Sequence, residues 1–174
     1  MKLDLYGWFP EENERVLSEL ISKYNIKTVI EIGCFLGKST AFFVGQGCRV
    51  ICVDTFKGSS DLNNCEEVKK RLPNLYNQFL FNMKALNIED RVRVVKGTSR
   101  DADRKYPGIK AELIFIDGSH EYEDVFHDIS AWKDRALKII CGDDYSPNHQ
   151  GVRRAVDELL PGANKDNRCW YFIK

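Results

Sequence analysis

The sequence predicts an α/β fold in which a mostly parallel sheet lies between two layers of helices, a three-layer α/β/α arrangement. Strand-like and helix-like segments alternate along the whole chain, which is typical of a parallel sheet covered on both faces. A glycine or an acidic residue follows each of the five strands expected before the C-terminal tail. Open α/β sheets bind ligands at the carboxyl ends of their strands, so this edge is the expected site. The 174 residues suit a single domain over 1–174, with residues 1–25 as an N-terminal helical extension.

The first half of the chain is expected to begin with a helix. Pro10 and the acidic residues after it favour a helix start, because proline is tolerated in the first turn and acids suit the helix dipole. Apolar residues then recur at helical spacing up to Tyr24. The β-branched run over 28–33 ends in glycine and predicts a buried strand. The other elements expected here are a helix over 39–44, a strand over 49–54 that ends in an acid, and helical structure over about 63–87 with a break at Pro73.

The second half of the chain predicts three more strands and a closing hairpin. Residues 91–97 alternate with a period of two, and 112–117 and 137–141 are short apolar runs. The last two apolar stretches, 159–163 and 169–173, predict an antiparallel hairpin at the end of the sheet. Helices are expected over 122–135 and 152–160.

Composition and charge indicate which kinds of binding partner to expect. Lys plus Arg and Asp plus Glu are 26 each, so the basic excess of a nucleic-acid binder is missing and a small-molecule acceptor is favoured. No apolar stretch resembles a signal peptide or approaches the ~18 residues of a membrane span, so no membrane partner is expected. The six cysteines form no C-x-x-C pair and are expected to be buried free thiols. Such thiols fit a reducing compartment, and we expect a cytoplasmic protein.

A loop with two glycines follows the first strand and opens the next helix. Gly33 and Gly37 let the backbone approach a ligand, and the helix start offers free N–H groups. A tight turn alone would also explain both glycines. Gly37-Lys38-Ser39 matches the end of a phosphate-binding P-loop, but the loop is one residue too short for that closed cradle. A nucleoside-binding loop instead predicts an acid at the end of the next strand, where Asp54 stands.

The segment EIGCFLGKST together with Asp54 resembles the class I S-adenosylmethionine-dependent methyltransferases. The resemblance implies a Rossmann-like doubly wound sheet, a glycine loop under the methionine part of S-adenosylmethionine (SAM), and a carboxylate on its ribose. Glu31 would support the loop or the cofactor's ammonium group. Thr98 and Ser99 match the position that meets the adenine, although a helix N-cap there is an equal alternative. The cofactor-binding residues implied are Glu31, Gly33, Phe35, Gly37, Ser39, Asp54, Thr98, Ser99 and Asp117.

Acidic residues follow the fourth and fifth strands. Asp117 ends one strand and Asp143-Asp144 follow the other, so three carboxylates would face one crevice. Like charges this close repel, and a hard cation such as Mg²⁺ with oxygen ligands relieves the repulsion. The alternative is that Asp143 and Asp144 are loop acids that cap a turn. We expect a magnesium site made of Asp117, Asp143 and Asp144, which would make an acceptor hydroxyl more acidic.

The runs IDGSHEYEDVFHDISAW, GDDY and GVRRAVDEL resemble the metal-dependent O-methyltransferases that act on sugar hydroxyls of antibiotics and related metabolites. This resemblance covers nearly the whole chain. In the more distant catechol O-methyltransferases, a lysine base stands three residues after the first metal acid, and here that position is His120. Histidine can take a proton near neutral pH, so Asp117 and His120 are the expected catalytic residues; a structural hydrogen bond is the alternative for His120. His149 is a second candidate base. The Lys-Pro-Gly-Gly turn usual before the fifth strand is absent here.

These patterns together predict Mg²⁺-dependent O-methylation of a hydroxyl on a sugar or catechol-like small molecule. A P-loop nucleotide-binding enzyme and a non-catalytic SAM-binding protein are the alternatives. Tyr6, Trp8 and Phe9 would partly cover the cofactor or plug the core, and the nearby pair Asp124 and Asp128 is expected on a solvated helix face. The short chain could leave the acceptor pocket open, or the partner subunit of a homodimer could complete it.

Overall fold

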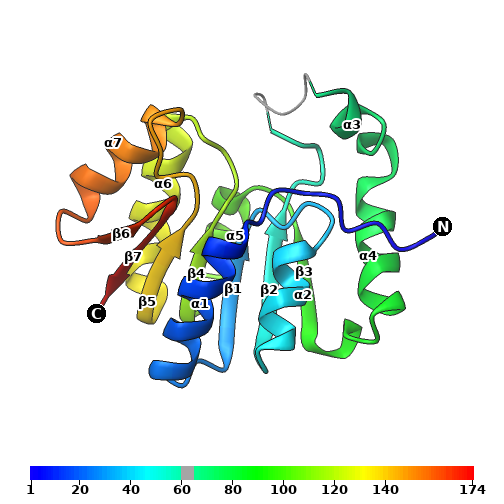
Figure 1. Cartoon of the computed structure of the whole chain (residues 1–174), viewed down its shortest axis with the longest axis horizontal. Helices are drawn as coiled ribbons and strands as arrows, with labels where there is room; N and C mark the ends of the chain where they lie inside the picture. The colour runs from blue at the N-terminus through cyan, green and yellow to red at the C-terminus, as the bar shows by residue number, and fades with distance from the viewer. Residues whose placement is uncertain (60–64) are drawn as a thin grey trace.

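The computed structural model describes residues 1–59 and 65–174 and contains one seven-stranded sheet (Figure 1). The strands are β1 (Thr28–Ile32), β2 (Arg49–Asp54), β3 (Val92–Lys96), β4 (Ala111–Ile116), β5 (Ala136–Gly142), β6 (Asn164–Asp166) and β7 (Cys169–Ile173). Their order across the sheet is β3-β2-β1-β4-β5-β7-β6. The first five strands run parallel, while β7 pairs antiparallel with both β5 and β6. The predicted Rossmann-like doubly wound sheet with a C-terminal antiparallel hairpin is confirmed.

Helices cover both faces of this sheet, as Figure 1 shows. They are α1 (Glu11–Lys23), α2 (Lys38–Gly45), α3 (Glu66–Lys69), α4 (Leu75–Ala85), α5 (Ser99–Lys105), α6 (Tyr122–Trp132) and α7 (Gln150–Leu159). Short 3₁₀ turns lie at Leu72–Asn74, Glu89–Arg91 and Lys133–Arg135. None of the helices in the described part of the chain is long and apolar enough to cross a membrane.

The sheet separates two hydrophobic cores because successive strand side chains point to opposite faces. In β1, Val29 packs in the core shared with α1, α2 and α4, whereas Ile30 packs in the core shared with α5, α6 and α7. Both side chains are fully buried. This explains why the central strands are continuous apolar runs, since each must bury both faces.

The predicted elements are present with three differences. The first arm of the hairpin is β6, not 159–163, because α7 ends at Leu159 and residues 160–163 form a turn that leads into β6. Helix α5 was not predicted, since Ala102 is its one buried side chain and it carries no apolar stripe. The helical stretch about Pro73 is split into α3, a 3₁₀ turn and α4, and the expected start at residues 63–64 lies outside the described residues.

The six cysteines are free thiols in the structure. Five of them are buried, and Cys65, just before α3, is half-buried. The prediction of buried free thiols is therefore confirmed for all but this residue.

Candidate active site

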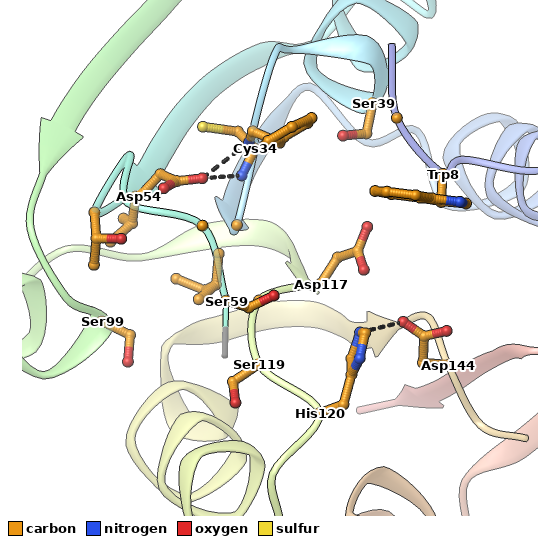
Figure 2. A pocket seen from close by; sticks show the side chains of 18 of the residues that line it. Trp8, Cys34, Ser39, Asp54, Ser59, Ser99, Asp117, Ser119, His120 and Asp144 are labelled. Carbon is orange, nitrogen blue, oxygen red and sulfur yellow. Dashed lines mark hydrogen bonds and ion pairs between the residues drawn. The ribbon is translucent and has the colours of Figure 1, made fainter. Parts of the chain in front are cut away.

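A cavity of about 600 Å³ lies at the carboxyl ends of the parallel strands. Its volume is in the range of small-molecule and cofactor sites. Figure 2 shows side chains from several separate segments around it. Residues that line it include Trp8 before α1, Phe35 and Asp54 after β1 and in β2, Ser99 at the start of α5, and Asp117 and His120 after β4.

The glycines of the loop after β1 are required by backbone conformation and close packing. Gly33 has φ +85°, and a Cβ there would lie 2.2 Å from the carbonyl oxygen of Asp117. Gly37 has φ +88°, and a Cβ there would lie 2.4 Å from the Cε of Met83. A side chain at either position would clash and would strain the left-handed backbone. The loop after β1 is thus held directly against the end of β4.

The carboxylate of Asp54 binds the glycine loop from the end of β2. Its Oδ2 accepts hydrogen bonds from the amides of Cys34 (2.8 Å) and Phe35 (2.9 Å), drawn as dashed lines in Figure 2. Its Oδ1 accepts a third bond, from the amide of Phe56 (2.6 Å). The amide of Gly37 donates to the carbonyl oxygen of Cys34 (2.7 Å). These loop amides therefore already have acceptors, and a carboxylate stands where a P-loop would cradle phosphate.

Glu31 lies buried beneath the loop and does not line the cavity. The hydroxyl groups of Ser39 and Thr40, at the start of α2, donate to its two carboxylate oxygens. Burial raises the pKa of Glu31 from 4.5 to about 7, although these hydrogen bonds oppose the change. Of the two roles expected for Glu31, its contacts match support of the loop and of α2, while Ser39 also lines the cavity.

Residues at the start of α5 form the far wall of the cavity. Thr98 is the N-cap of α5, as one of the two alternatives predicted, and exchanges hydrogen bonds with Asp101; it also lines the cavity, so its contact with the adenine stays a prediction. The hydroxyl of Ser99 donates to the carboxylate of Asp128 from α6. The expectation of a solvated face was wrong for Asp128, which is buried, and burial raises its pKa to about 7. Asp124 is exposed as expected.

The three acids expected to bind a metal do come together. One carboxylate oxygen from each of Asp117, Asp143 and Asp144 lies within 4.8 Å of the others, and we call this group the acidic trio. Burial and the charges of the other two acids raise the pKa of Asp117 well above its ordinary value. In the described residues, no hydrogen bond reaches the Asp117 carboxylate. Asp117 and Asp144 line the cavity, whereas Asp143 lies behind them.

Two histidines and an arginine surround Asp144. The Nε2 atom of His120 lies 2.6 Å from its Oδ2, and the Nδ1 atom of His149 lies 3.1 Å from its Oδ1. The guanidinium of Arg168 contacts both Asp143 and Asp144. Burial opposes ionisation of Asp144, but the His120 bond and these positive charges outweigh it and lower its pKa. The sequence offered no signal for Arg168, because it reaches the trio from the β6–β7 turn.

A comparison with models of known protein families identifies the family of this chain. Residues 30–145 match the family described as a methyltransferase domain, which is more than half of the chain. The chain belongs to this methyltransferase family. The resemblance predicted from the sequence is thereby confirmed, and no curated protein sequence gives a significant match.

Solved structures that share the methyltransferase fold include several O-methyltransferases. The O-methyltransferase from Bacillus cereus in complex with S-adenosylhomocysteine (SAH) has a TM-score of 0.70 and 18% identity, covering 99% of this chain and 84% of its own. TomG from Streptomyces achromogenes, involved in tomaymycin synthesis and solved with SAM, has a TM-score of 0.66 and 15% identity, and the match covers 94% of this chain and 79% of TomG. CalS11, a TDP-rhamnose 3'-O-methyltransferase, has a TM-score of 0.59 and 16% identity, and the match covers 94% of this chain and 81% of CalS11. At these identities the likeness shows the fold.

The N-terminal segment of the methyltransferase both plugs the core and reaches the cavity. Phe9 is buried and packs against Phe43 and Phe115. Trp8 is 45% exposed, lines the cavity and lies near Asp117 in Figure 2. Tyr6 lines the same wall, with its ring 5.3 Å from that of Trp8. Phe9 therefore plugs the core as expected, while Tyr6 and Trp8 line the cavity, where covering the cofactor stays a prediction.

Most of the residues predicted to bind cofactor, metal or proton in the methyltransferase border the same cavity. The exceptions are Glu31, Gly37 and Asp143, which lie behind its wall and support residues that line it. Arg168 and Asp128 also line the cavity and were not predicted to be part of the site.

Proposed function

We propose that this methyltransferase transfers the methyl group of SAM to a hydroxyl group of a small molecule, such as a sugar or a catechol. The observation that carries the proposal is that one cavity borders both the Asp54 loop and the acidic trio with His120. These are the two halves that such a reaction needs: a place for the cofactor and a place to orient and deprotonate the acceptor.

The cofactor would lie between the glycine loop and the start of α5. When bound, SAM supplies an electrophilic methyl group on a sulfonium. Asp54 fits the ribose because its carboxylate stands at the cavity wall and keeps a free acceptor position. A carboxylate has about four such positions, of which two are used by the glycine loop and one by the amide of Phe56. Ser99, and Asp128 behind it, offer polar groups to the adenine at the opposite wall.

The acidic trio fits a magnesium ion in its donor chemistry. All three side chains offer carboxylate oxygens, the ligands that Mg²⁺ prefers, and they lie within 4.8 Å of one another. Asp117 and one remaining acceptor position on each of Asp143 and Asp144 would hold the ion. When bound, Mg²⁺ would make an acceptor hydroxyl more acidic and fix its position.

His120 is the proposed base, and Asp144 positions it. Nε2 of His120 bonds to Asp144, and the imidazole of His120 would take the proton from the acceptor hydroxyl. The Asp144 carboxylate stabilises the imidazolium that results. The acceptor oxygen would then bond to the methyl carbon that SAM supplies as its carbon–sulfur bond breaks, with SAH as the leaving group. His149, whose Nδ1 lies 3.1 Å from the hydroxyl of Ser146, is the alternative base.

Calorimetry with SAH and with ATP tests the cofactor assignment. We expect SAH to bind and ATP to leave no heat signal, because Asp54 would repel a triphosphate at the loop. A screen of hydroxylated sugars and catechols, with SAH release as the readout, tests the reaction. SAH binding without methyl transfer to any acceptor would favour the non-catalytic alternative, and ATP binding would contradict the proposal.

A further inference from the structure

Arg168 gives the acidic trio a positive charge of its own. Its Nε donates to Oδ1 of Asp143 (3.1 Å), and its Nη2 donates to Oδ2 of the same residue (3.1 Å) and to Oδ1 of Asp144. The two acids are almost fully buried, with 1% and 6% of their side chains exposed. A fork of donors on two buried carboxylates is a strong, charge-assisted contact.

The C-terminal hairpin fixes the position of Arg168. The carbonyl oxygen of Arg168 accepts a bond from the amide of Tyr145 (2.9 Å), just after the two acids. The indole of Trp170 donates to the carbonyl oxygen of Asp143 (3.1 Å). The arginine therefore stands on a backbone that is bonded to the same segment as its partners. Its side chain is 40% exposed, so the guanidinium itself lies at the rim of the site.

The contacts of Arg168 use acceptor positions that a metal ion would need. Oδ1 of Asp143 accepts from Arg168 and from the amide of Asp144, and Oδ1 of Asp144 meets Arg168 and His149. Oδ2 of Asp144 is taken by His120. Each of the two acids thus has about one of four positions left. Arg168 does not contact Asp117, so the acceptor positions of the Asp117 carboxylate are not used by the arginine.

We propose that Arg168 is an internal counter-cation that competes with a divalent metal ion for the acidic trio and weakens metal binding. The inference rests on the magnesium site of the proposed function. Arg168 places a positive charge against Asp143 and Asp144, which reduces the negative charge of the site and repels a second cation nearby. The trio is then stable without metal, and the ion binds reversibly instead of being a permanent part of the protein.

Manganese binding, followed by electron paramagnetic resonance of the free ion, tests this competition. We expect Arg168→Gln to bind Mn²⁺ at least about tenfold more tightly than the unmodified protein, and Arg168→Lys to stay within about threefold because it keeps the charge. Arg15→Gln is the matched control, since Arg15 also pairs with two carboxylates, Asp166 and Glu19, but on the surface. Equal or weaker binding by Arg168→Gln would overturn the inference.

Two further measurements separate the possible failures. SAH affinity is measured on every variant: if no variant binds Mn²⁺ while SAH still binds, the competition and the magnesium site both fall, but the methyltransferase assignment stands. If Arg168→Gln does not fold alone, Mn²⁺ should restore its folding, because the ion replaces the missing charge. Failure of Mn²⁺ to do so would also overturn the inference.

Discussion

At the residue scale, Asp54 both shapes the glycine loop and faces the cofactor cavity. We expect Asp54→Asn to weaken SAH binding about tenfold or more, because a charged acceptor is lost and an amide group would face the loop N–H donors. Calorimetry with SAH measures the change. Asp134→Asn, at an 86% exposed side chain, is the control and should bind SAH normally. Unchanged affinity in Asp54→Asn would remove Asp54 from the cofactor site.

A substitution at His120 should slow the chemical step without changing the affinity for the cofactor. We expect His120→Asn to lower the rate of methyl transfer by about 10²–10⁴-fold with little change in SAH affinity, because a positioned base is lost. Single-turnover methyl transfer is the measurement. His149→Asn, measured beside it, identifies the base: a larger loss there would assign the proton transfer to His149.

The residues that were not predicted share one property. Arg168 and Asp128 reach the site through long-range contacts, with Asp143 and Asp144 in one case and Ser99 in the other. No local pattern marks such contacts. The predicted residues Asp54, Asp117, Asp143 and Asp144, by contrast, stand at strand ends, where the repeated strand-then-polar pattern indicates a ligand edge.

At the element scale, the turn from β1 into α2 depends on glycine. We expect Gly33→Ala to lower the free energy of unfolding by about 2–4 kcal/mol, because its Cβ would lie 2.2 Å from the Asp117 carbonyl and its φ is +85°. Chemical denaturation measures the loss. Gly45→Ala, in α2 with no atom within 4 Å of the added Cβ, should be neutral or slightly stabilising. Equal effects at the two positions would contradict the proposed packing role.

The buried carboxyl group of Glu31, which joins β1 to α2 through Ser39 and Thr40, should make the free energy of unfolding depend on pH. With a folded pKa of about 7 and an unfolded value near 4.5, Glu31 keeps a proton in the folded protein that the unfolded chain releases. Its contribution is complete below pH 4.5 and is lost as pH rises towards 7, a decline of up to about 3 kcal/mol. Urea unfolding of the unmodified protein and of Glu31→Gln at several pH values measures the decline as their difference. A difference that is constant with pH would contradict it.

Elements with strong periodicity were predictable, and weakly patterned ones were not. The central strands bury both faces, so their apolar runs are unmistakable in the sequence. Helix α5 buries only Ala102, and its start is marked by a capping box instead of a hydrophobic stripe. The first arm of the hairpin is three mostly exposed residues, Asn164–Asp166, which have no strand-like pattern.

At the scale of the whole molecule, the sheet places the proposed cofactor half and the proposed acceptor half of the cavity on different strands. The glycine loop and Asp54 belong to β1 and β2, whereas the acidic trio belongs to the ends of β4 and β5. We expect EDTA to reduce methyl transfer and excess Mg²⁺ to restore it, while SAH affinity stays unchanged. Methyl transfer and calorimetry on the same sample measure both. Full activity in EDTA would remove magnesium from the reaction.

The distribution of thiols gives the molecule a ready handle for chemical labelling. Burial raises the pKa of each of the five buried cysteines, which keeps them protonated and unreactive. Cys65 differs, because the backbone amides of Val68 and Glu67 lower its pKa. A maleimide dye therefore has one preferred target in the unmodified protein. Since Val68 borders the cavity, a fluorophore on Cys65 would sit close enough to report ligand arrival by its emission.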